Sequence, residues 1–152
     1  MRYARVLGRI LGTLLPLVWS SSLLVAQNQE HLQYSVVFSD SKDVTHFRYE
    51  NLAWQSTEGT AGPLLATPFL DAEKIGFLRI PRGYRADWHP APSRRFVMVL
   101  SGTAEIEVGD GDRRMFGPGS VVLMTDTTGR GHRTNALANQ DVFLVWVPVP
   151  ER

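Results

Sequence analysis

The chain has 152 residues, of which 43% are hydrophobic and 20% charged, a composition that fits one globular domain and excludes disordered and fibrous proteins. The absence of cysteine excludes disulfide bonds, thiolate metal sites and a cysteine nucleophile. Although the formal net charge is +1, three of the 16 basic side chains and none of the 15 acidic ones lie in residues 1–26. The remaining 13 basic and 15 acidic side chains give no electrostatic reason to expect nucleic-acid binding.

Residues 1–26 have the layout of a secretory signal peptide. Three arginines precede a mostly apolar run over residues 10–26, after which the sequence turns polar. Ala26 is the candidate cleavage residue, so residues 27–152 are expected to form one exported domain, periplasmic or secreted. The alternatives are an uncleaved membrane anchor over residues 10–26, which would bring membrane contact, and a mitochondrial presequence. The 17-residue run is shorter than the roughly 20 apolar residues that a spanning helix needs, which favours the signal peptide.

After residue 30 the pattern is that of a β protein. Apolar residues either alternate with polar ones or form brief runs of strand length, and no stretch keeps a helical period. A loop is expected over residues 56–68, which hold two glycines and two prolines, and tight turns are expected at 108–113 and 116–120. Many short strands joined by regular turns predict an antiparallel sandwich or barrel. We expect strands over residues 34–38, 47–54, 75–80, 96–100, 104–108, 113–116, 120–124 and 142–149.

The stretch from Gly83 to Gly102 keeps a characteristic spacing. Gly83 is followed by five residues and then by His89, and Arg95 is followed by six residues and then by Gly102. The stretch resembles the first motif of the cupins, small antiparallel jelly-roll barrels, which runs Gly, five residues, His-x-His, three or four residues, Glu, six residues, Gly. Ala91 stands in place of the second histidine and Arg95 in place of the glutamate. The spacing is kept, while two of the three ligand positions have changed.

A second, looser match follows 16 residues later. The second cupin motif runs Gly, five residues, Pro-x-Gly, two residues, His, three residues, Asn. Gly119 and the next five residues fit its start, Thr125 and Thr127 replace the proline and the glycine, and His132 arrives two residues late. Counted from His132, Asn135 comes one place early. Together the two motifs resemble those of small single-domain bacterial cupins.

The resemblance implies an all-β fold, the cupin double-stranded β-helix or jelly-roll barrel, and a homodimer, because small cupins commonly pair their sheets across a dimer interface. It also implies a divalent Fe, Mn, Ni or Zn ion held by three histidines and a glutamate. Only His89 and His132 stand at matching or near-matching positions, and two imidazoles alone make a weak metal site. Because side chains alternate along a strand, Asp87 would share a face with His89, which could complete a two-histidine, one-carboxylate set.

Arg95 argues against a metal. A guanidinium stays protonated in proteins. At about 5 Å from a divalent ion, with an effective dielectric constant of about 20, its repulsion would be roughly 6 to 7 kcal/mol. Without a metal, Arg95 in an apolar barrel needs a partner, either Asp87 in an internal ion pair or the carboxylate, enolate or phosphate of a ligand. His89 and His132 would then donate or accept protons near neutral pH.

We therefore expect an exported cupin barrel, metal-free or with a weak metal site, that binds a small anionic or oxygenated molecule at His89, Arg95 and His132. These residues are also the candidate catalytic set for lyase, isomerase or cyclase chemistry, and whether the protein is an enzyme stays open. One alternative is a metal-dependent dioxygenase or isomerase that uses His89, His132 and Asp87; another is a non-catalytic regulatory or structural barrel. Asp126 and Arg130 are expected to hold His132 in place, and His46 is expected at a surface or strand edge.

Overall fold

Residues 31–151, as described by a computed structural model, form eleven strands and contain no helix. The predicted all-β class is therefore confirmed. No helix in this part of the chain could cross a membrane. The predicted signal peptide or anchor, residues 1–26, lies outside the described residues.

The strands are short and follow the predicted runs closely. They are β1 (His31–Ser39), β2 (Thr45–Ala53), β3 (Gln55–Thr57), β4 (Leu64–Ala66), β5 (Gly76–Ile80), β6 (Arg95–Ser101), β7 (Ala104–Glu107), β8 (Arg113–Phe116), β9 (Val121–Met124), β10 (Arg133–Ala136) and β11 (Val142–Pro148).

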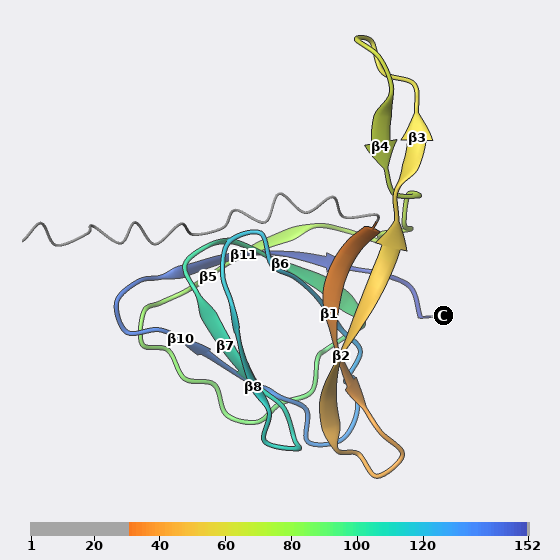
Figure 1. The fold of residues 1–152 in the computed structure, drawn as a ribbon. Helices are drawn as coiled ribbons and strands as arrows, with labels where there is room; N and C mark the ends of the chain where they lie inside the picture. Colours follow the sequence, from red (N-terminus) through yellow and green to blue (C-terminus); the bar gives the residue numbers. More distant parts are fainter. Residues whose placement is uncertain (1–30, 152) are drawn as a thin grey trace, which may run out of the picture.

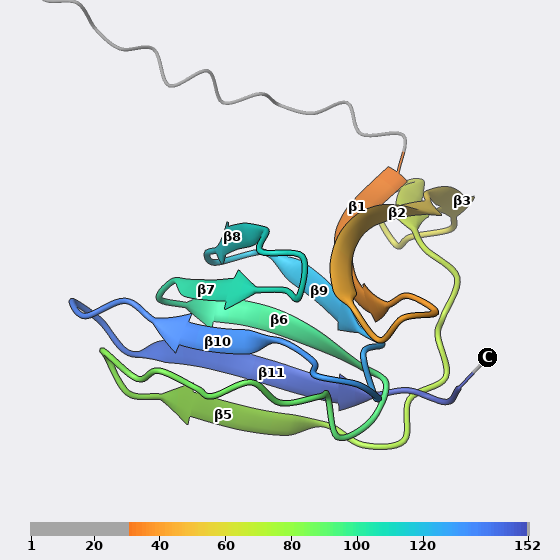
Figure 2. The same ribbon diagram turned by 90° about the horizontal axis from the view of Figure 1, so that it is seen from below.

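Two sheets form the barrel. The larger has the strand order β2-β1-β9-β6-β11-β5, and the smaller has the order β10-β7-β8. In Figure 1 the small sheet lies opposite β5, β6 and β11 of the large sheet. Figure 2, turned by 90°, shows β1 and β2 curling around one end of the molecule. The pairing is antiparallel throughout except between β1 and β9, which are parallel. The predicted antiparallel barrel thus has one parallel pair, between strands that are far apart in sequence and are not joined by a hairpin.

The predicted turns are confirmed, and the strands that the sequence missed are only three or four residues long. Gly111 has φ 91° and donates to the carbonyl of Val108 in the β7–β8 hairpin, and Ser120 donates to that of Gly117. The expected loop over residues 56–68 instead contains most of a β3–β4 hairpin, which projects from the barrel in Figure 1 and is exposed along both strands. The hairpin was missed, as was β10, because strands of three or four residues are too short to show a clear period-two pattern.

The core lies between the two sheets. Along β6, Val97 and Val99 face the interior, because side chains on a strand alternate. They pack with Val122 and Leu144 of the same sheet and with small-sheet residues such as Ile106. A second apolar cluster, which includes Tyr34, Val36 and Leu123, covers the opposite face of the large sheet. Burying each such aliphatic side chain contributes roughly 1.5–3 kcal/mol, so the two clusters hold the sheets in place.

Candidate functional site

A cavity of about 400 Å³ lies between the two sheets. Its wall is built from β5, β6, β9 and β11 of the large sheet, from β7, β8 and β10 of the small sheet, and from the segment that precedes β6. All three residues that the sequence predicts for a binding site, His89, Arg95 and His132, line this cavity. His89 and Arg95 lie six positions apart, whereas His132 comes 37 positions after Arg95, so it is the fold that brings the second motif to the first.

His89 and His132 form a backbone bridge between the two motifs. Each N–H donates to the other residue's carbonyl at 3.0 Å, and the ring centroids lie 4.7 Å apart with the planes at 53°. The late position of His132 is absorbed by the preceding loop, where Gly129 and Gly131 have φ of 72° and 74°. These positive values favour glycine, and a Cβ at Gly131 would overlap the His89 carbonyl. The two extra residues thus shape the loop without separating the histidines.

Asp126 holds His132, as the sequence predicts. The Nδ1 of His132 lies 2.7 Å from Oδ2 of Asp126, and both side chains are buried. The backbone carbonyl of Asp126 also accepts from the N–H of Ala91, which ties this loop to the first motif. Because Nδ1 is engaged, Nε2 is the ring nitrogen left for a ligand. Arg130, which was also expected to hold His132, instead stacks on Trp88: its Cζ lies 3.9 Å from the centroid of the Trp88 ring.

Arg95 is held without a carboxylate. Its Nε and Nη2 donate to the backbone carbonyl and the hydroxyl of Ser93, both at 3.1 Å, and its Cζ lies 5.0 Å from the ring centroid of Trp146. Among the described residues nothing hydrogen-bonds to its Nη1 and no acid pairs with it. Burial lowers the pKa of this guanidinium, which nevertheless remains charged near neutral pH. The cavity therefore contains a cation with unused donors.

Trp146 is a site residue that sequence reasoning missed. It follows Val142 and Leu144 at a spacing of two along β11, so its side chain faces the interior. The alternation was visible in the sequence, but the stacking on Arg95 depends on the pairing of β11 with β6, which places Trp146 opposite Val97.

Asp87 lies apart from the other candidate ligands. It is exposed, it does not line the cavity, and its backbone carbonyl rather than its carboxylate meets Nδ1 of His89 at 2.8 Å. The internal ion pair with Arg95 is not formed. Within residues 31–151 no group of three histidines or acids could hold a metal ion. This donor set does not fit the metal that the resemblance implies, and metal binding by His89, His132 and Asp87 stays a prediction for measurement.

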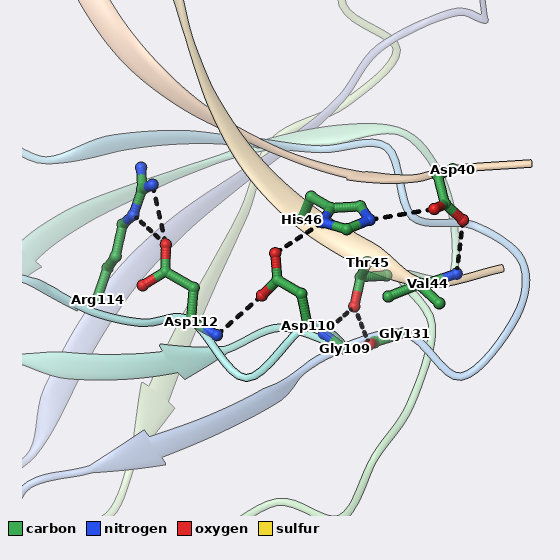
Figure 3. A network of polar contacts seen from close by, with 9 residues as sticks. All are labelled: Asp40, Val44, Thr45, His46, Gly109, Asp110, Asp112, Arg114 and Gly131. Atoms are coloured by element: carbon green, nitrogen blue, oxygen red, sulfur yellow. Dashed lines mark hydrogen bonds and ion pairs between the residues drawn. The ribbon is translucent and has the colours of Figure 1, made fainter. Parts of the chain in front are cut away.

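His46 lies on the edge strand β2, as expected, and joins a network outside the cavity (Figure 3). Its Nδ1 is 2.6 Å from Oδ2 of Asp110 and its Nε2 is 3.2 Å from Oδ2 of Asp40. Chiefly because of Asp110, the pKa of His46 is raised. Backbone N–H groups lower the pKa of both acids, those of Val44 and Lys42 for Asp40 and that of Asp112 for Asp110.

Thr45 links this network to the site. Its hydroxyl donates to the carbonyl of Gly131 at 2.7 Å and accepts from the N–H of Gly109 (Figure 3). Since Gly131 directly precedes His132, the β2 edge, the β7–β8 hairpin and the site loop are fastened at one point.

Cupin barrel proteins are among the solved structures similar to this chain. The cupin domain of Schizosaccharomyces pombe Cnp3 is 14% identical, with a TM-score of 0.42 over 81% of this chain and 86% of that one. A cupin 2 conserved barrel domain protein from Salinispora arenicola is 23% identical, with a TM-score of 0.39 over 62% and 74%. A protein of unknown function from Streptococcus pyogenes is 23% identical, with a TM-score of 0.39; the match covers 51% of this chain but 65%, less than two thirds, of that protein. No protein-family profile and no curated protein matches the sequence.

The class of protein is thus a small all-β barrel with cupin proteins among its structural neighbours and a cavity between its sheets.

Proposed function

We propose that the protein binds a small anionic or oxygenated organic molecule in the cavity between its sheets. The observation that carries this proposal is Arg95, a partly buried guanidinium that lines the cavity and pairs with no acid among the described residues. Ser93 supplies two neutral acceptors but no counter-charge, and a ligand carboxylate would supply one.

The rest of the cavity supports an anion over a cation. None of the described residues that line it is acidic, whereas His89 and His132 lie in its wall beside Arg95. An imidazole whose Nδ1 is held by a buried carboxylate is well placed to exchange a proton through Nε2. Acid–base catalysis on a bound ligand is therefore compatible with the site, and binding is the part of the function that we propose.

Thermal unfolding with and without small carboxylates tests the proposal. We expect at least one of four small carboxylates, formate, acetate, benzoate and lactate, to raise the melting temperature. A ligand at 100 times its Kd stabilises the folded state by about 2.7 kcal/mol. Arg95→Ala should abolish the rise. Arg94→Ala is the matched control, because Arg94 is the adjacent arginine, does not line the cavity and bonds the carbonyl of Pro150 instead. No rise across the panel, or an equal rise in both variants, would overturn the proposal.

Metal analysis separates this proposal from a metal-dependent enzyme. Protein purified without chelator is expected to hold less than about a tenth of an equivalent of Fe, Mn, Ni or Zn. About one equivalent, lost in His89→Ala, would instead support the metal-dependent alternative that uses His89, His132 and Asp87.

A further inference from the structure

The cavity wall is apolar apart from a few side chains. Its polar members are Tyr84, Thr134, His89, His132 and two arginines, and the remaining lining residues have aliphatic or aromatic side chains. Buried polar groups of a ligand would find few partners against such a wall, and each unpaired one would weaken binding. The body of the ligand is therefore expected to be hydrocarbon.

Arg95 is the cation in this wall that can take a ligand. The second arginine, Arg79, is mostly exposed and forms an ion pair with Asp141, its Nε lying 2.7 Å from Oδ2. Ser93 accepts from Nε and from one of the two N–H groups of Nη2, so Nη1 is the nitrogen of Arg95 that has no hydrogen bond among the described residues. One cation with one free nitrogen matches a single carboxylate and leaves a second negative charge without a partner.

We infer that the ligand is a monocarboxylic acid with an apolar body, its carboxylate on Nη1 of Arg95 and its body against the inner valines and Trp146. The inference rests on the proposed function and narrows it from small anions in general to one chemical class. A wall rich in Val, Leu and Ile discriminates by hydrocarbon burial, which is worth about fourfold in affinity for each CH₂ group.

Four probes matched in size or charge test the inference by calorimetric titration: acetate, hexanoate, hexanamide and adipate. Hexanoate is expected to bind at least tenfold more tightly than acetate, because it buries four more CH₂ groups. The affinity for hexanoate should also be about tenfold or more higher than the affinity for hexanamide and for adipate. Hexanamide lacks the charge, and adipate brings a second carboxylate into the apolar wall.

The outcomes separate this inference from the function on which it rests. If acetate or adipate binds as tightly as hexanoate and Arg95→Gln abolishes the binding, the apolar-acid class is wrong while anion binding stands. If none of the three carboxylates, acetate, hexanoate and adipate, binds the wild-type protein, the proposed function fails. The comparison of probes uses the wild-type protein, so it does not depend on how any variant folds.

Val97→Phe locates the binding inside the barrel. Val97 is buried, lines the cavity and lies opposite Trp146 on the neighbouring strand, so a larger side chain there reduces the space for a ligand body. Hexanoate affinity should fall about tenfold or more while acetate affinity changes less than about threefold. An unchanged preference for hexanoate in this variant, with its melting curve showing a folded protein, would place the binding elsewhere.

Discussion

At the scale of single residues, Gly131 is where the geometry of the site is most constrained. Its φ of 74° is one that side-chain-bearing residues rarely adopt, and a Cβ there would meet the His89 carbonyl, which accepts from the N–H of His132. The bridge between the two histidines can form because this position has no side chain.

Gly131→Ala is therefore expected to destabilise the protein by about 2–4 kcal/mol, from backbone strain and from loss of the two bridge hydrogen bonds. Urea unfolding measures the change. Gly119→Ala is the matched control, because Gly119 has φ 85° but nothing within 4 Å of an added Cβ, and it should cost only the strain, about 1–2 kcal/mol. Equal losses in the two variants would show that the bridge tolerates the added methyl group.

At the scale of elements, the His46 network fastens the β1–β2 turn to the β7–β8 hairpin. Each ring nitrogen of His46 faces a carboxylate oxygen, and the two acids are Asp40 and Asp110. A neutral imidazole carries one N–H, so both contacts are hydrogen bonds only when the ring is protonated. Arg114 is the other charged side chain that acts on Asp110.

The stability of the protein is therefore expected to depend on pH through this network. The raised pKa of His46 contributes stability below its unfolded pKa of about 6.5, and this contribution is lost as pH rises through the higher folded pKa. The lowered pKa values of Asp40 and Asp110 contribute above about 3.9 and are lost as pH falls through the folded values. The network is thus strongest between about pH 4 and 6.5.

Melting temperatures of wild type and His46→Gln, measured from pH 5 to 9, check this dependence. Wild type should be more stable by a few degrees at pH 5.5, since the side chains are partly exposed and water screens the pairs, and the difference should shrink by pH 9. In an Asp40→Asn, Asp110→Asn background the histidine substitution should have little effect at any pH. A difference that grows with pH would contradict the proposed protonation.

At the scale of the whole molecule, the outer face of the large sheet exposes apolar side chains near its β5 edge. Phe77, Leu100 and Phe143 are 74%, 55% and 43% exposed, and they lie on β5, β6 and β11, which are neighbours in the sheet. We propose that this face pairs with a second copy, as the resemblance to small cupins implies, and that the mature chain is exported after removal of residues 1–26.

Native mass spectrometry of protein recovered from the producing organism tests both proposals together. The expected species is a dimer of chains that begin near residue 27, and Phe77→Asp should convert it to a monomer, because a charge would be buried in the interface. A monomer at micromolar concentration would contradict the pairing. Recovery of intact Met1 in a soluble cytosolic fraction would contradict export.

The sequence by itself determined the all-β class, most strand positions and the residues around which the cavity is built. Period-two alternation and Asp-Gly or Gly-Pro turns are local properties of a chain, so they can be read without the fold. The spacing of Gly83, His89 and Gly102 placed the first motif, and the second motif pointed to His132, which lines the cavity although it comes two residues late. The sequence did not predict the β3–β4 hairpin and β10, because their strands are too short to show a clear alternation.

Only the tertiary structure decided what those residues touch. It separated Asp87 from the cavity, left Arg95 stacked on Trp146 with one free nitrogen, and buried Asp126 against His132. It also made β1 and β9 parallel, a pairing between strands far apart in the chain. These outcomes depend on which strands become neighbours and on where side chains leave space, and such long-range packing is set by the whole barrel rather than by any short stretch of sequence.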